Sequence, residues 1–267
     1  MLRDITLGQY FPGDTIIHRL DPRTKLIMVV VYIVALFMAK SWTAYGTMLV
    51  LLVCLIAVSQ ISIKTILRSL RPIIIVIVIT AALNIFFTEG EALVEFWVIK
   101  ITREGLVLAA KMALRLAMLI TGTFMLTYTT SPIALTDGIE SLFKPLTAIR
   151  FPVHELAMIM SLALRFVPML IEETQKIISA QKARGADFET GNIMHRAKAL
   201  LPVLVPLFIN EFRRADDLAD AMESRCYHGG TGRTRMKQLK LRLRDAASFI
   251  AGAATIFVIV LFNRLPW

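Results

Sequence analysis

The sequence contains only two cysteines and four histidines among its 267 residues. Cys54 lies inside a long apolar run, whereas Cys226 lies in a polar segment, so the two thiols are expected at different depths. We therefore expect neither a disulfide framework nor a cysteine-based metal site. The segment HELAM at 154–158 begins like the zinc-binding helix of metalloproteases, but Met158 stands where the second histidine is required. No metal site is predicted.

Motifs for nucleotide or hydrolytic chemistry are also missing. The glycine-rich segment GGTGRT at 229–234 lacks the Gly-Lys-Ser/Thr ending of a phosphate loop and the third glycine of a dinucleotide loop, so we interpret it as a linker. No serine, histidine and acid form a recognisable nucleophile arrangement. We predict that the chain is not an enzyme and holds no cofactor of its own.

Long apolar runs dominate what is present. Hydrophobic residues make up 56% of the chain, and the mean hydropathy is +0.65. Soluble domains usually contain about 45–50% apolar residues, whereas a membrane-spanning helix needs roughly 20 in a row. The alternating pattern of outer-membrane barrel strands is missing. We predict an all-α polytopic membrane protein with about five transmembrane helices, at 26–43, 44–60, 72–88, about 109–130 and about 245–263.

The formal net charge is +10 and the isoelectric point is about 9.9. In a membrane protein, an excess of Lys and Arg marks the cytoplasmic loops, so we expect lipid and not nucleic acid as the partner of this charge. Basic residues gather in the first 25 residues and at 61–71, whereas the connection 88–105 is rich in glutamate. This predicts a cell-membrane protein whose N-terminus and 61–71 loop are cytoplasmic. Five spans then place the C-terminus outside.

The region 131–244 differs from the rest of the chain. It holds 17 of the 30 Lys and Arg residues, against 12 of the 20 Asp and Glu. This excess predicts a cytoplasmic region. We therefore divide the chain into 1–130, with an N-terminal cytoplasmic segment and four transmembrane helices, the cytoplasmic region 131–244, and a last transmembrane helix at 245–267. A short helix is expected at 136–146.

Two helices of the cytoplasmic region are predicted to end close to an arginine. Residues 174–185 are helix formers that stop at a glycine, and residues 210–226 repeat apolar side chains at helical spacing. Arg184 and Arg225 stand near these two ends. A solvated arginine favours a helix C-terminus by itself. An exposed arginine can also enter an acidic groove on a partner and form bidentate hydrogen bonds there.

Two apolar runs in this region are candidates for further spans. Residues 156–171 include an arginine and a proline, and residues 199–209 are too short to cross. We favour the alternative in which neither run crosses and both pack in long helices. Arg184 and Arg225 then both lie inside, whereas Arg184 would lie outside if both runs crossed.

Charged residues within a predicted span need an explanation, because such residues are usually paired or functional. Lys111 and Arg115 lie one helical turn apart near the outer end of the fourth span. They either extend to the outer interface or contact a partner or a carbonyl of a neighbouring helix. Asn84 is the one candidate for a polar group in a transport path, and it equally suits helix packing.

Three segments together carry a resemblance that covers the chain nearly end to end. They are FPGDTIIHRLDPRTKL at 11–26, LALRFVPMLIEETQKIISAQKARGAD at 162–187, and RRADDLADAMESRCYHGGTGRTR at 213–235. The chain resembles the transmembrane T component of energy-coupling factor (ECF) importers for vitamins and metals. The resemblance implies a membrane part followed by long cytoplasmic coupling helices.

The resemblance also implies partners. In that family, two ABC-type ATPases bind the coupling helices through Ala-Arg-Gly motifs at the helix ends, and ATP and magnesium are held by the ATPases. Here the second motif departs from Ala-Arg-Gly at its first and third positions but keeps the arginine. The implied ATPase-coupling residues are Ala183, Arg184 and Gly185 in the first motif, and Ser224, Arg225 and Cys226 in the second.

A separate membrane subunit, the S component, binds the substrate in that family. The resemblance implies that this chain couples ATP-driven motion to the S component and does not bind the substrate itself. The apolar faces of the coupling helices would hold the S component, at Leu156, Met160, Leu164, Pro168, Pro202 and Pro206.

Two other classes of function compete with this interpretation. A self-sufficient carrier or channel needs polar residues on facing spans and often contains internal repeats, and neither is visible. An intramembrane enzyme needs a Ser/His, paired-Asp or metal set within the spans, which is missing from the sequence.

Overall fold

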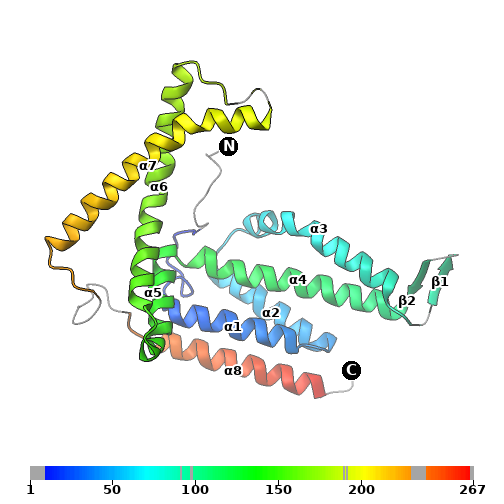
Figure 1. Cartoon of the computed structure of the whole chain (residues 1–267). Helices are drawn as coiled ribbons and strands as arrows, with labels where there is room; N and C mark the ends of the chain where they lie inside the picture. Colours follow the sequence, from blue (N-terminus) through cyan, green and yellow to red (C-terminus); the bar gives the residue numbers. More distant parts are fainter. Residues whose placement is uncertain are drawn as a thin grey trace. The chain divides into compact units, whose positions relative to one another are not determined.

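The structure, a computed structural model, describes residues 10–90, 92–96, 99–188, 190, 192–229 and 239–264. This part of the chain forms two compact units. We call residues 10–141 with 239–264 the bundle unit, and residues 142–229 the crossed-helix unit. Helices dominate both units (Figure 1).

Four helices of the bundle unit surround a common centre. Helix α1 packs against α8 and α4, and α2 packs against the same two helices, while α3 lies along α4 (Figure 1). The buried core of this ring contains Tyr32, Leu36, Tyr45, Met48 and Met118. The four helices are α1 (Pro22–Met38), α2 (Trp42–Ser59), α4 (Arg103–Thr129) and α8 (Leu243–Arg264), and the helix outside the ring is α3 (Ile63–Phe87).

Short polar side chains define where two of these helices begin. The carboxylate of Asp21 accepts a hydrogen bond from the Arg23 amide at 3.0 Å and caps α1, with a proline at the first helical position. The hydroxyl of Thr102 accepts from the Gly105 amide at 3.1 Å and caps α4. Helix α2 ends where Gln60 turns into the left-handed region, with φ of 56°.

All five predicted transmembrane segments are helical, and the all-α prediction is confirmed for the described residues apart from one small hairpin. The boundary of the third helix was predicted wrongly. Residues 61–71 were expected as a loop, but α3 begins at Ile63. Lys64, Arg68 and Arg71 recur at spacings of four and three, so their charges share one helical face instead of marking a loop.

Among the described residues, five helices are long and apolar enough to cross a membrane: α2, α3, α4, α8 and, in the other unit, α6 (Val153–Ala183). Helix α1 has 17 residues and ends at Met38, earlier than the predicted 43. Helix α6 contains the apolar run 156–171, so this run meets the length and composition of a span. Our expectation that 156–171 does not cross stays a prediction.

The connection between α3 and α4 contains the hairpin. Strand β1 (Ala92–Phe96) pairs antiparallel with β2 (Ile99–Thr102), with Phe96 opposite Ile99 and Glu95 opposite Lys100. The sequence analysis predicted an acidic connection here and no strand. Two strands of four and five residues give too little periodic pattern to recognise.

The crossed-helix unit contains two helices of 31 residues each, α6 and α7 (Ile193–Glu223), which pack against each other and cross (Figure 1). The predicted helices 174–185 and 210–226 form their C-terminal parts. The second was predicted three residues too long, because α7 ends at Glu223. The predicted helix 136–146 is α5 (Pro132–Phe143), followed by the 3₁₀ helix η2 (Lys144–Ile149).

Candidate coupling site

The first predicted arginine motif is the C-terminal cap of α6. Ala183 is the last helical residue, and Gly185 takes a left-handed conformation with φ of 86°. The Gly185 amide donates to the Lys182 carbonyl at 3.0 Å, and the Ala186 amide donates to the Gln181 carbonyl at 3.0 Å. This pair of hydrogen bonds defines a Schellman cap. Arg184 is the residue that follows the helix, and its side chain is exposed.

The second predicted motif has the same cap at the end of α7. The Cys226 amide donates to the Glu223 carbonyl at 2.8 Å, and the Tyr227 amide donates to the Met222 carbonyl at 3.1 Å. Cys226 takes the left-handed conformation, with φ of 55°. Ser224, Arg225 and Cys226 therefore occupy the same cap positions as Ala183, Arg184 and Gly185. The departure from Ala-Arg-Gly leaves the helix end unchanged.

The two arginine side chains share an environment as well as a backbone. Both are exposed, and within the described residues neither guanidinium has a hydrogen-bond or ion-pair partner. Each stands at a helix C-terminus, where the partial negative charge of the helix dipole favours a positive charge. The structure thus presents two equivalent cationic tips, Arg184 and Arg225. We refer to them as the tip arginines.

The cap at Cys226 makes a prediction about stability. The left-handed conformation costs a residue other than glycine about 1–2 kcal/mol of conformational free energy. Cys226→Gly is therefore expected to stabilise the end of α7 by about 1 kcal/mol. Hydrogen exchange at the amides of residues 220–227 should slow accordingly. Gly185→Ala is the matched reverse change and should speed exchange at the end of α6. Equal exchange in both variants and wild type would contradict the proposed role of this conformation.

A polar contact joins α6 and α7. Arg214 Nη2 donates to Glu173 Oε2 at 3.0 Å, and Asn210 Nδ2 donates to Glu173 Oε1 at 2.7 Å. Arg214 Nη1 also donates to Glu211 Oε1 at 2.7 Å. This contact was not predicted, because Glu173 and Arg214 are 41 residues apart and no periodic pattern in the sequence links them.

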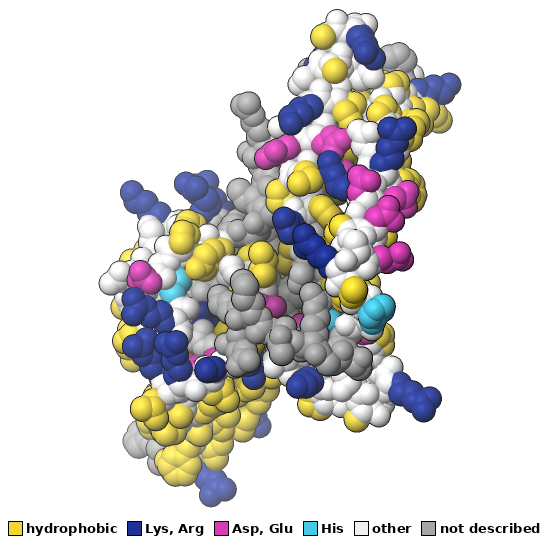
Figure 2. Space-filling model, turned by 90° about the vertical axis from the view of Figure 1, so that its left-hand side faces the viewer, with side chains coloured by type: hydrophobic (Ala, Val, Ile, Leu, Met, Phe, Trp, Pro, Cys, Tyr) yellow, Lys and Arg dark blue, Asp and Glu magenta, His cyan; other side chains and the backbone are white. Residues whose placement is uncertain are grey.

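The predicted S-component residues form parts of an exposed apolar surface. On α6, Leu156 and Met160 are 44% and 54% exposed, whereas Leu164 is half-buried. Pro168 and Pro202 are exposed and Pro206 is half-buried, all three inside continuous helices. Figure 2 shows hydrophobic side chains at the surface beside basic and acidic ones. The large exposed side chains of α7 are Met194, Leu200, Leu201, Leu204, Val205, Phe208, Ile209 and Phe212, of which all but Met194 and Phe212 lie in the apolar run 199–209.

Residues 11–26, the first of the three segments that carry the family resemblance, hold one end of the bundle unit together. We call them the signature segment. The buried Asp245 of α8 accepts hydrogen bonds from the Asp21 amide at 2.9 Å and the Arg242 amide at 2.7 Å. Lys25 of α1 donates to the Thr129 carbonyl of α4 at 2.8 Å. Three helices, α1, α4 and α8, are thereby joined at this end. We call these contacts the N-terminal clasp.

His18 extends the clasp through the signature segment. Its Nε2 lies 3.1 Å from the Phe11 carbonyl, which can only accept, and its Nδ1 lies 2.6 Å from the Thr15 hydroxyl. Burial lowers the pKa of His18 below its usual value near 6.5, so the ring is neutral at pH 7, with its proton on Nε2. The Phe11 amide donates to the Tyr128 carbonyl at 3.0 Å and ties the segment to α4.

Lys111 and Arg115 contact backbone carbonyls of the turn between α1 and α2. This agrees with the predicted alternative in which the two side chains contact neighbouring carbonyls. Lys111 Nζ donates to the Lys40 carbonyl and Arg115 Nη2 to the Ala39 carbonyl, both at 3.0 Å. Asn263 of α8 accepts from the Lys40 amide at 3.1 Å. The turn between α1 and α2 is therefore held by α4 and α8 together.

Comparisons with known proteins agree with the sequence resemblance. The family model described as "Cobalt transport protein" (CbiQ) matches residues 13–237. The energy-coupling factor transporter transmembrane protein EcfT of Thermosediminibacter oceani is 54% identical over 266 residues, covering 100% of both chains. EcfT of Clostridium kluyveri is 54% identical over 271 residues, with 100% of this chain and 99% of the relative covered. EcfT of Lactococcus lactis subsp. cremoris is 41% identical over 265 residues, with 99% and 100% covered.

The chain belongs to the family of transmembrane components of energy-coupling factor transporters. As a member of the EcfT family, it is a multi-pass membrane protein and one subunit of an ECF transporter, which confirms the resemblance found in the sequence.

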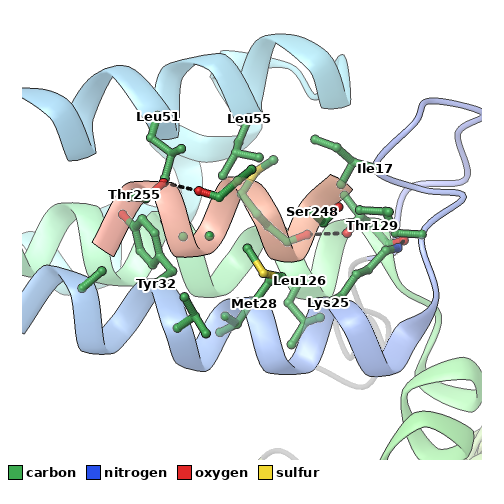
Figure 3. A pocket seen from close by; sticks show the side chains of 18 residues that line it. Ile17, Lys25, Met28, Tyr32, Leu51, Leu55, Leu126, Thr129, Ser248 and Thr255 are labelled. Atoms are coloured by element: carbon green, nitrogen blue, oxygen red, sulfur yellow. Dashed lines mark hydrogen bonds between the residues drawn. The ribbon is translucent and has the colours of Figure 1, made fainter. Parts of the chain in front are cut away.

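A cavity inside the bundle unit of this EcfT family member is apolar. It measures about 200 Å³ and lies among α1, α2, α4 and α8 (Figure 3). Two of its polar side chains form hydrogen bonds with backbone carbonyls. Lys25 donates to the Thr129 carbonyl, and Thr255 Oγ1 donates to the Ala251 carbonyl at 2.8 Å. A path for a hydrated ion or a polar vitamin requires polar lining. This cavity therefore gives no support to the carrier alternative.

The Asn84 side chain forms a hydrogen bond within its own helix. Its Nδ2 donates to the Thr80 carbonyl of α3 at 2.8 Å, and the side chain is half-buried. Whether Asn84 also packs against another helix stays a prediction. The described residues contain no group of three or more metal-binding side chains.

Proposed function

We propose that the chain is the non-catalytic coupling subunit of an ECF importer, bound through its two tip arginines to two ABC-type ATPases. The observation that carries the proposal is the repeated cap: Arg184 and Arg225 follow the two long helices in the same Schellman geometry, exposed and without a partner in the described residues. An exposed guanidinium in a fixed position can enter an acidic groove and form bidentate hydrogen bonds.

The helices behind the tips suit the transmission of motion. Helices α6 and α7 have 31 residues each, which corresponds to roughly 46 Å of helix at about 1.5 Å per residue. A stiff helix anchored at its tip moves as a rigid body when the groove that holds it moves. ATP and magnesium would be held by the ATPases, and this chain would hold no cofactor.

The exposed apolar surface of α6 and α7 is proposed as the contact for the S component. Large exposed apolar patches mark membrane or protein contacts. Leu156, Met160 and Pro168 on α6 and Pro202 on α7 would contribute, together with Phe208. The substrate, a vitamin or a metal ion, would bind to the S component and not to this chain.

We further propose that the protein lies in the cell membrane with its N-terminus in the cytoplasm and its C-terminus outside. The excess of Lys and Arg in the first 25 residues and in residues 131–244 supports this orientation. The tip arginines would then be on the side where ATP is available.

The test is reconstitution of the protein in vesicles with and without its partners. The purified chain alone is expected to neither hydrolyse ATP nor take up substrate. Vesicles that also contain the host's two ABC-type ATPases and an S component are expected to import the substrate of that S component when ATP is supplied on the ATPase side. Uptake by the chain alone would support the carrier alternative and refute the proposal.

A further inference from the structure

The polar contact between Glu173 and Arg214 holds the two coupling helices together at a defined point. One guanidinium joins Glu173 of α6 to Glu211 of α7, and Asn210 adds a second hydrogen bond to Glu173. The side chains of Glu173 and Arg214 are 19% and 31% exposed. Partial burial reduces the screening by salt that weakens fully exposed ion pairs.

The two tip arginines lie at equal distances from this contact along their helices. Arg184 is the eleventh residue after Glu173, and Arg225 is the eleventh residue after Arg214. Both intervals are helical almost to their ends, because α6 reaches Ala183 and α7 reaches Glu223. At about 1.5 Å per residue, each interval is roughly 16 Å long. We call residues 173–184 the first arm and residues 214–225 the second arm. The two arms start at the contact and have equal length.

A second hydrogen bond braces one of the arms. Gln181 Nε2 of α6 donates to the Pro202 carbonyl of α7 at 3.3 Å. Gln181 stands three residues before Arg184, so this hydrogen bond lies close to the tip of α6. The first arm is therefore held against α7 at two points, Glu173 and Gln181.

We infer that Glu173 and Arg214 are positioning residues that fix where α6 and α7 cross and thereby set the separation of the two tip arginines. The inference rests on the proposed coupling function. With arms of equal length, a change in crossing angle displaces both tips by the same amount. Two ATPases that move toward each other would then displace α6 and α7 by equal amounts. If the Glu173–Arg214 contact moved along one helix, the tip arginine of that helix would no longer lie in its groove.

The experiment uses the complete transporter with its ATPases and S component. The variants are Glu173→Arg, Arg214→Glu and the double exchange, each in a chain that keeps Cys54 and Cys226 and carries genetically encoded spin-labelled amino acids at positions 179 and 220. Each single reversal puts like charges in contact. We expect a shifted or broadened distance distribution between the labels and a loss of uptake per ATP hydrolysed of roughly tenfold.

The double exchange restores opposite charges between α6 and α7 but loses the Arg214–Glu211 pair and the Asn210 hydrogen bond, so it is expected to return both readouts part of the way from the single variants to wild type. Glu172→Arg is the matched control. It makes the same charge change as Glu173→Arg at the adjacent residue, whose side chain is exposed. Unchanged label distances in the single variants, or a double exchange no better than either single change, would overturn the inference. If the ATPases fail to co-purify with the wild-type chain, the proposed function fails instead.

Discussion

Reversing both tip arginines, Arg184→Glu with Arg225→Glu, is expected to abolish the retention of ABC-type ATPases by this chain. A hydrogen bond to a charged group contributes about 1.5–3 kcal/mol, so losing both tips removes roughly 3–6 kcal/mol, which is more than about 100-fold in affinity. The glutamates also introduce repulsion from an acidic groove. The measurement is co-purification of the tagged chain with the host's ATPase subunits after detergent solubilisation.

Controls separate docking from folding. Both arginines are exposed and follow the helices, so their replacement removes no hydrogen bond described within the chain. The double variant should therefore insert into the membrane and elute as a folded protein like the wild type. Lys176→Glu and Arg213→Glu make the same charge reversals at exposed positions of α6 and α7, away from the tips. They are expected to retain both ATPases.

The single variants carry additional information. The two caps are equivalent in hydrogen bonding although one motif reads Ala-Arg-Gly and the other Ser-Arg-Cys. We therefore expect Arg184→Glu and Arg225→Glu to weaken retention by similar amounts. Full retention of both ATPases by the double variant would contradict the assigned role of the tips and, with it, the coupling mechanism.

The tips could be predicted from the sequence because their signals are local. A run of helix formers, a basic last turn and a following glycine announce the end at Arg184 within about ten residues. The end of α7 was harder, because Cys226 occupies the position that glycine usually takes. Its left-handed conformation is visible only in the structure, and the predicted helix therefore ran three residues too far.

Contacts between distant segments could not be predicted in the same way. Glu173 and Arg214 are ordinary surface charges of an amphipathic helix until the crossing of α6 and α7 brings them together. The same holds for Asn263, which reaches the turn at Lys40 from the last helix of the chain. Periodicity reports which face of a helix is apolar, but not which helix packs against it.

Asp245 illustrates the limit most clearly, because in the sequence it is one more acid in the first turn of an apolar helix. In the structure its side chain is buried and accepts backbone hydrogen bonds from Asp21 and Arg242. Its partner Asp21 belongs to the N-terminal signature segment, 224 residues away. The signature thus has a physical role in this fold, which is to close one end of the bundle unit around α8.

Replacing this carboxylate, Asp245→Ala, is expected to cause the largest loss of stability in the bundle unit. The buried Asp21 amide and the partly buried Arg242 amide lose their acceptor, and an unsatisfied buried donor costs about 1–3 kcal/mol. The free energy of unfolding should fall by roughly 2–5 kcal/mol, which lowers the melting temperature of a chain of this size by about 5–15 °C. The measurement is thermal unfolding of the purified protein in detergent.

Two variants distinguish the clasp from a general effect of removing an acid. Asp14→Ala makes the same change in the signature segment at a side chain that is 93% exposed, and it should change stability by less than about 0.5 kcal/mol. Asp245→Asn keeps one acceptor oxygen and should fall between Asp245→Ala and wild type. Because the clasp joins α1, α4 and α8 and the tips lie on α6 and α7, ATPase retention should persist in Asp245→Ala at temperatures where it is folded. Equal melting temperatures for Asp245→Ala and Asp14→Ala would show that the signature segment does not depend on Asp245.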